Sequence, residues 1–166
     1  MNLSLIHRIR RNHALEHATL NLLGKRHPNA QAMGISGPRG FTIYTSLTAE
    51  EIVPAAMEAL KRLKAGEGAL RVHRNCGTNT VVTATLTTLA TLLGIRGTKP
   101  SFRESLERLP HLILLNVLAL LAAPTLAEWV QGTLTTDPNL ADVEIASIFT
   151  DYHRGLQRIR VHTRQL

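Results

Sequence analysis

The sequence predicts an α+β domain, a two-helix transmembrane hairpin and a short C-terminal segment. Three observations support this fold class. The first 76 residues switch between helical and alternating apolar periodicity, whereas residues 77–95 and residues 112–127 carry no formal charge. We therefore expect an α/β domain over 1–76, the hairpin with its connecting loop over 77–134, and the C-terminal segment over 135–166.

The α/β domain is expected to follow the order α-β-β-α-β. Apolar residues recur at helical spacing over residues 3–23, and two short strands flank the turn "SGPRG". Thr48 with Glu51 matches a capping box, so a second helix begins there. The stretch "ALRVHR" at 69–74 is typical of a third strand.

Two transmembrane helices are expected at about 77–95 and 111–131, joined by an amphipathic loop. The first run has seven threonines, whose hydroxyls can bond back to their own helix and so be tolerated in lipid. Small residues on one face predict close packing on another membrane subunit or on a second copy of the chain. They are Thr80, Ala84, Thr87, Thr91 and Gly94. The alternative is a buried helix or a long strand in a soluble protein.

The C-terminal segment has a mixed pattern. Residues 141–157 favour a helix, and residues 158–164 favour a strand or an exposed tail.

The lack of a recognisable signal peptide and the cysteine usage indicate which side of the membrane the N-terminal domain occupies. The N-terminus lacks the apolar core of a signal peptide, and a single cysteine suits a reducing compartment. We expect a multi-pass protein with its N-terminal domain in the cytoplasm. Four basic residues in the connecting loop would favour a cytoplasmic position for that loop, although the hairpin places it on the other side of the membrane. They are Arg96, Lys99, Arg103 and Arg108. A different topology, or one span that is re-entrant, is therefore the alternative.

The net charge of +7 lies mainly at the front of the chain. Residues 1–77 hold 11 Lys and Arg against 5 Glu, whereas aromatic residues make up only 4% of the chain. Because no nucleic-acid-binding motif is present, we expect the partner of this charge to be the lipid bilayer rather than nucleic acid. Arg8, Arg10 and Arg11 would hold the first helix against anionic headgroups.

The stretch "HALEH" carries the most distinctive chemistry. His13 and His17 are four residues apart, so a helix places both imidazoles on one face, where they can hold Zn²⁺ or Fe²⁺. Glu16 completes H-x-x-E-H, the arrangement of inverted zincins, in which the glutamate is a general base for metal-bound water. The alternative is a surface helix with solvated histidines.

A metal ion needs a third ligand, for which Cys76 in "RVHRNCGTNT" is the best candidate. Two histidines and a thiolate leave an open fourth position. His73 is an alternative ligand, and the alternative for Cys76 is a small buried packing residue.

The chain resembles an uncharacterised family of small bacterial membrane proteins. The resemblance rests on "RNHALEHATLNLL" (11–23), on Gly37, Gly40 and Phe41 in a G-x-x-G-F pattern, and on "HRNCGTN" (73–79). It implies a membrane location and no defined activity.

The metal motif is also similar to that of S-ribosylhomocysteinase. In that lyase H-x-x-E-H is followed by a cysteine in C-x-T, which implies His13, His17 and Cys76 as ligands and Glu16 as base. Pitrilysin-type peptidases also carry H-x-x-E-H, with a glutamate as third ligand, and no acid here stands in a matching place.

Three functions are consistent with these features. The first is a membrane-anchored metal-dependent hydrolase, peptidase-like, that acts on membrane-associated peptides or amphiphiles. The second is a non-catalytic accessory or assembly subunit of a membrane complex, with at most a structural metal. The third is a metal-binding sensor or carrier.

Overall fold

The protein is described by a computed structural model that covers residues 5–95, 102–153 and 155–165. Its contacts divide the chain into two compact units. The sheet unit comprises Met1–His73 and Gln131–Leu166, and the helical unit comprises Arg74–Val130. The chain therefore leaves the sheet unit at His73 and returns to it at Gln131.

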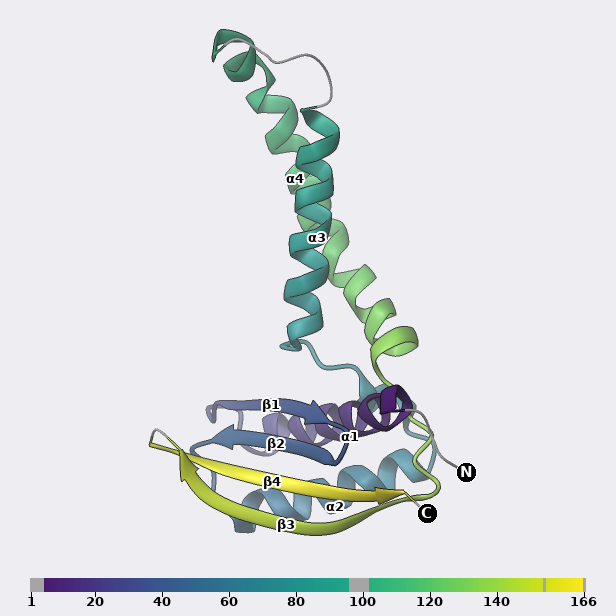
Figure 1. Ribbon diagram of the computed structural model, residues 1–166. Coiled ribbons are helices and arrows are strands. Elements are labelled where there is room, and N and C mark those ends of the chain that lie inside the picture. The colour runs from purple at the N-terminus through teal and green to yellow at the C-terminus, as the bar shows by residue number, and fades with distance from the viewer. Residues whose placement is uncertain (1–4, 96–101, 154, 166) are drawn as a thin grey trace. The chain divides into compact units, whose positions relative to one another are not determined.

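The sheet unit is mixed α+β, with one antiparallel sheet in the strand order β1-β2-β4-β3. Helices α1 and α2 both lie on one face of this sheet (Figure 1). In chain order the elements are α1 (Leu5–Arg26), β1 (Ala32–Gly37), β2 (Gly40–Thr45), α2 (Ala49–Lys64), the 3-10 turn η1 (Gly68–Arg71), the π-helical turn η2 (Gln131–Thr135), β3 (Val143–His153) and β4 (Leu156–Gln165).

The first two helices and the hairpin between them agree with the sequence prediction. The capping box at the start of α2 is present, because the backbone N–H of Thr48 donates to Glu51 Oε2 at 2.8 Å. In β2, Phe41 and Ile43 are buried toward the helices, whereas Thr42 and Tyr44 are half-buried on the other face. This alternation is the pattern of a strand that is covered on one side.

The third strand predicted at 69–74 is wrong. Residues 68–71 form the 3-10 turn η1, and their carbonyls are used by side chains of α1. Asn21 Nδ2 donates to the carbonyls of Leu70 and Val72 at 3.0 and 2.8 Å. With these acceptors engaged, the segment has no free row of carbonyls for a neighbouring strand.

The helix predicted over 141–157 is also wrong, because this region forms β3. A bulge between Ile145 and Ser147 changes the register with β4. The residues that pack on the core are consequently Val143, Ile145 and Ile148. Their spacing of two and then three residues imitates a helical pattern.

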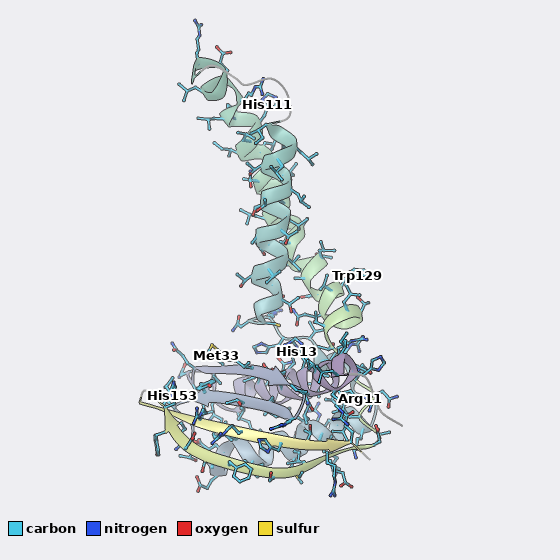
Figure 2. The ribbon with its side chains drawn as sticks, in the orientation of Figure 1. Arg11, His13, Met33, His111, Trp129 and His153 are labelled. Atoms are coloured by element: carbon cyan, nitrogen blue, oxygen red, sulfur yellow. The ribbon has the colours of Figure 1, made fainter. Side chains whose placement is uncertain are left out.

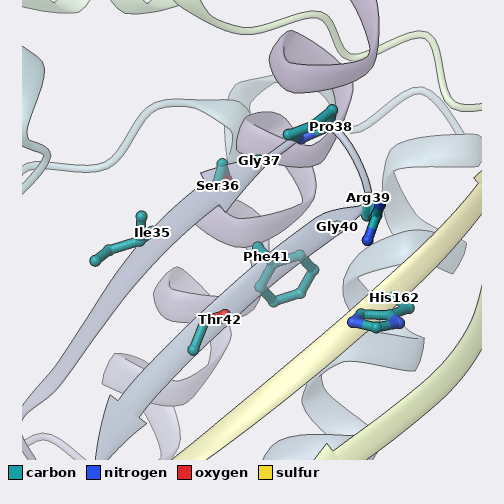
Figure 3. Close-up of a pocket in the computed structure, with 9 residues that line it drawn as sticks. All are labelled: Ile35, Ser36, Gly37, Pro38, Arg39, Gly40, Phe41, Thr42 and His162. Carbon is teal, nitrogen blue, oxygen red and sulfur yellow. The ribbon is translucent and has the colours of Figure 1, made fainter. Parts of the chain in front are cut away.

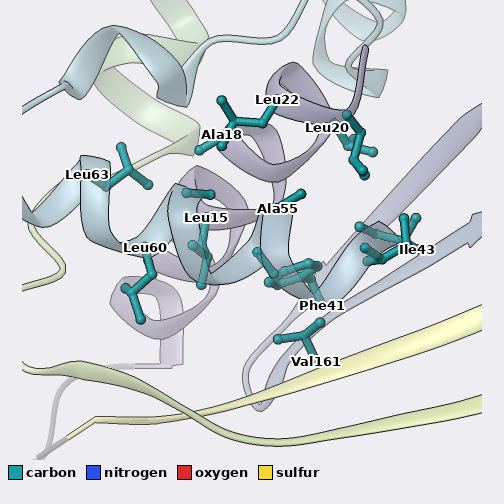
Figure 4. Close-up of a cluster of buried hydrophobic side chains, with 14 of the residues drawn as sticks. Leu15, Ala18, Leu20, Leu22, Phe41, Ile43, Ala55, Leu60, Leu63 and Val161 are labelled. Atoms are coloured by element: carbon teal, nitrogen blue, oxygen red, sulfur yellow. The ribbon is translucent and has the colours of Figure 1, made fainter. Parts of the chain in front are cut away.

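The core of the sheet unit lies between the sheet and the two helices (Figure 4). Leu15 of α1, Phe41 and Ile43 of β2, Ala55 of α2 and Val161 of β4 are all almost fully buried. The C-terminal strands thus supply part of the core that encloses α1, and are not a separate segment.

The helical unit contains α3 (Gly77–Gly94) and α4 (Phe102–Val130), which pack against each other. Asn116 of α4 donates to Thr91 Oγ1 of α3 at 3.1 Å, which satisfies a polar group between two apolar helices. The small-residue face predicted on α3 is only partly used in this packing. Gly94 lies against Leu112 and Thr91 bonds Asn116, whereas Thr80 and Ala84 are exposed.

Among the described residues, one helix is long and apolar enough to cross a membrane, the 30-residue stretch Leu106–Thr135. Of the two predicted spans, the second one, at about 111–131, thus corresponds to a helix that could cross a membrane. Helix α3 forms where it was expected, but its threonines make it less apolar than a typical span. The predicted amphipathic loop lies outside the described residues over 96–101, and residues 102–110 begin α4.

Candidate metal centre

The site begins on α1, where helical spacing brings His13 and His17 together. Their ring centres are 4.1 Å apart, and the rings meet edge to face. The prediction that the two imidazoles share one face of a helix is therefore confirmed.

Backbone carbonyls fix the orientation of both rings. His13 Nδ1 lies 3.0 Å from the carbonyl oxygen of Thr135, and His17 Nδ1 lies 2.6 Å from that of Arg71. A carbonyl can only accept, so each Nδ1 carries a proton, and the neutral form of each ring then keeps its lone pair on Nε2. This hydrogen bond from the second ring nitrogen is the usual support of a metal-binding histidine.

His17 is the most informative member of the site. It is 1% exposed, and its Nε2 is buried without a hydrogen-bond partner in the described structure. Leaving a buried polar atom unpaired costs about 1–3 kcal/mol. A cation bound to Nε2 would remove this cost.

Cys76 is the N-cap of α3, where its sulfur accepts the backbone N–H of Thr78 at 3.4 Å. The positive end of the helix dipole favours an anionic sulfur at that position. Each of His13, His17 and Cys76 offers a ligand atom, and these atoms all lie within 4.8 Å of one another.

His73, the alternative ligand, lies on the segment that connects η1 to Cys76. Its ring centre is 5.7 Å from that of His17, and its Nδ1 is buried without a hydrogen-bond partner among the described residues. Burial, together with the nearby His17, lowers the pKa of His73 to about 4. The side chain is therefore a neutral imidazole at ordinary pH.

Glu16 is buried on the side of α1 that faces β1. Its carboxylate accepts a hydrogen bond from the Ser36 hydroxyl. Burial raises the pKa of Glu16, and the Ser36 hydrogen bond and the charge of His13 oppose that rise. A carboxylate whose pKa is moved toward neutrality can both take up and release a proton.

Gly34 makes the space that Glu16 occupies. A Cβ at residue 34 would lie 2.5 Å from Glu16 Cδ and 2.6 Å from Cγ, and closer still to Oε1. Gly34 and Ser36 were not among the residues expected at the site. They are two residues apart on β1 and so lie on one face of the strand, but nothing in the sequence relates that face to Glu16.

Ser36 also lines a pocket of about 280 Å³ at the β1–β2 hairpin (Figure 3). The remaining lining residues are Ile35, Gly37, Pro38, Arg39, Gly40, Phe41, Thr42 and His162. The residue that holds the Glu16 carboxylate thus also borders a cavity of the sheet unit.

The predicted membrane-surface patch of Arg8, Arg10 and Arg11 does not form as a group. Arg11, which Figure 2 labels, is 7% exposed. Its Nη1 donates to both carboxylate oxygens of Asp142 at 2.9 and 3.0 Å. Arg10 donates to the carbonyls of Thr133 and Thr136. Both guanidinium groups therefore bind the returning chain, and only Arg8 is exposed.

Comparison with known proteins places residues 8–148 in a family described as "Domain of unknown function (DUF6391)". An uncharacterized protein of Picosynechococcus sp. (strain ATCC 27264 / PCC 7002 / PR-6) is 36% identical over 88 residues, which cover 48% of this chain and 43% of the relative. The chain thus covers less than half of that relative. No solved structure matches. The resemblance to an uncharacterised family is confirmed at this level, and the similarity to S-ribosylhomocysteinase stays a prediction.

Proposed function

We propose that this chain, which belongs to the DUF6391 family, is a membrane-anchored, metal-dependent hydrolase of peptidase type. His13, His17 and Cys76 would hold Zn²⁺ or Fe²⁺, and Glu16 would be the general base. Substrates would be membrane-associated peptides or amphiphiles.

The observation that carries this proposal is the state of His17. Its imidazole is buried and oriented by the Arg71 carbonyl, its Nε2 has no hydrogen-bond partner, and two further soft or borderline ligand atoms lie close by. Nitrogen and thiolate ligands in a group of three suit zinc or ferrous iron, with a fourth position for water.

Glu16 supplies the acid–base chemistry in this proposal. A bound metal ion would lower the pKa of a water molecule, and the Glu16 carboxylate would take the proton of that water as its oxygen bonds to the carbonyl carbon of the substrate. When the C–N bond breaks, the same carboxyl group returns the proton to the leaving amine. The Ser36 hydrogen bond holds the carboxylate while it exchanges this proton.

Anchoring is supported by the exposed apolar surface of the helical unit. Ile113, Leu118 and Leu121 of α4 are 61%, 53% and 72% exposed. A helix that is apolar on all sides and not buried suits lipid. We extend this to a two-helix hairpin in the cell inner membrane, with the sheet unit in the cytoplasm.

Two substitutions test the proposal. Purified protein should carry about one zinc or iron per chain, and Cys76→Ser should remove it. Glu16→Gln should keep the metal and the fold but abolish cleavage of membrane-associated peptides. Glu50→Gln, at the exposed start of α2, should leave the metal content, the fold and the cleavage activity unchanged. A Cys76→Ser protein with full metal content would exclude the ligand set.

A second candidate is a non-catalytic subunit of a membrane complex, or a chain that self-associates. The specific observation is the hydroxyl-rich face of α3, on which Thr80 and Thr88 are exposed. Such a face suits close packing of a further helix. Leucine at Thr80 and Thr88 would then abolish co-purification of a partner or the dimer, and Glu16→Gln would have no effect.

A further inference from the structure

We propose that His73 is a fourth protein ligand of the metal ion, which fills the position otherwise open to water and leaves it when a substrate binds. This inference rests on the proposed metal site of His13, His17 and Cys76.

The first support is the placement of His73. It precedes Cys76 by three residues, and its backbone N–H donates to Gln131 Oε1 at 2.9 Å, which fixes the segment beside α1. Two imidazoles that share one zinc ion, with bonds of 2.0–2.1 Å, have ring centres about 5 Å apart. The separation of 5.7 Å between His73 and His17 is close to this value.

The second support is the chemistry of the two rings. His17 Nε2 and His73 Nδ1 are both buried without a hydrogen-bond partner in the described part of the chain. An imidazole nitrogen that keeps its lone pair is a ligand that zinc and ferrous iron accept. One ion shared by His13, His17 and His73 would account for both unpaired nitrogens.

The third support explains why His73 is the ligand that leaves. The rings of His13 and His17 are each anchored by a backbone carbonyl, that of Thr135 and that of Arg71. In the described part of the chain neither nitrogen of the His73 ring has such an anchor, and His73 is not part of the group whose ligand atoms lie within 4.8 Å. A ligand without an outer-shell partner is bound less firmly, so a small rotation of His73 opens the ion.

Cobalt and a small anion test the inference on the full chain in detergent. Co²⁺-loaded protein is titrated with thiocyanate, and binding is followed by visible absorption. His73→Ala should retain one Co²⁺ per chain and bind thiocyanate at least roughly tenfold more tightly than the wild type, the scale on which single interactions tune a metal site. His153→Ala, an exposed histidine of β3, should match the wild type.

Three outcomes would overturn the inference. Equal thiocyanate affinity of the wild type and His73→Ala would show that the fourth position is already open. Loss of Co²⁺ from His73→Ala with unchanged far-UV circular dichroism would show that His73 is a permanent ligand. If the alanine variant misfolds, His73→Gln is used for the same measurements. If the wild type binds no Co²⁺, the proposed metal site itself fails, which metal analysis distinguishes from the other two results.

Discussion

Replacing Gly34 with alanine tests whether Glu16 occupies the place that the structure gives it. The new methyl group would lie 2.5 Å from Glu16 Cδ and 2.6 Å from Cγ, whereas carbon atoms in contact are about 3.5–4.0 Å apart. Glu16 must therefore retreat by about 1 Å. It is only 4% exposed, so it cannot move freely into solvent, and its hydrogen bond with Ser36 is lost.

The expected cost follows from these changes. Overpacking costs about 1–3 kcal/mol and a hydrogen bond to a charged group contributes about 1.5–3 kcal/mol, while replacing glycine within a strand returns about 0.5–1 kcal/mol. We expect Gly34→Ala to lower the free energy of unfolding by about 2–4 kcal/mol. Urea unfolding of the purified chain in detergent, followed by circular dichroism, measures this change.

Two controls sharpen the measurement. Gly24→Ala places a methyl group on α1 with nothing within 4 Å, so it should stabilise the protein by about 0.5–1 kcal/mol. In a Glu16→Ala background the cost of Gly34→Ala should disappear, because the clashing side chain is gone. A cost that is the same in both backgrounds would refute the contact between the two residues.

Two further predictions concern ion pairs of the sheet unit. Arg11→Met should lower the free energy of unfolding by about 2 kcal/mol. This is less than the roughly 3–5 kcal/mol lost when a fully buried ion pair is broken, because the Asp142 side chain is 34% exposed. Arg8→Met should have little effect in the same urea titration, and equal losses in the two variants would contradict a stabilising ion pair between Arg11 and Asp142. A hydrogen bond from Arg158, together with the charges of Arg158 and Arg160, lowers the pKa of Asp151. The ionised carboxylate therefore stabilises the fold above the unfolded pKa near 3.8. This stabilisation is lost as the pH falls through the lower pKa of the folded state. Asp151→Asn should therefore lower the melting temperature at pH 7 and converge with the wild type near about pH 2, and a difference that is constant across this range would show that the carboxylate charge is not the cause.

Local signals in the sequence predict the front of the sheet unit well. The capping box at Thr48, the hairpin and the pairing of His13 with His17 depend on residues within a few positions of one another. The physical rules that govern them, helix capping and helical or strand periodicity, act over the same short range.

The remaining half of the sheet could not be predicted in this way, because its determinants are distant in the chain. Asn12 is fully buried, and its amide joins the Gly37 carbonyl to the Thr163 hydroxyl, 151 residues away. Arg11 was assigned to the membrane for the same reason, since its partner Asp142 lies 131 residues further on. A charged residue on a predicted helix does not show whether it faces headgroups or a carboxylate of the same domain.

The candidate site shows a similar division. The two proposed imidazole ligands and the proposed base follow from a five-residue motif. The carbonyls that orient the imidazoles belong to Arg71 and Thr135, however, and Gly34 leaves the space for Glu16. Every residue has a backbone carbonyl, and a glycine can serve many purposes, so a sequence alone does not show which of them shape a site. They become visible only when the elements are packed together.

The return of the chain to the sheet unit has a practical consequence for engineering. The N–H of His73 and the side chain of Gln131 are hydrogen-bonded, so the points where the chain departs and re-enters are neighbours within one unit. A few flexible residues would span that distance, since each extends by about 3.3–3.6 Å. Joining 73 to 131 in this way should yield a small protein that retains α1, the four described strands and the three histidines of the candidate site without the apolar helices. Cutting the chain after residue 76 would instead remove β3, β4, Asp142, which pairs with Arg11, and Thr163, which bonds Asn12.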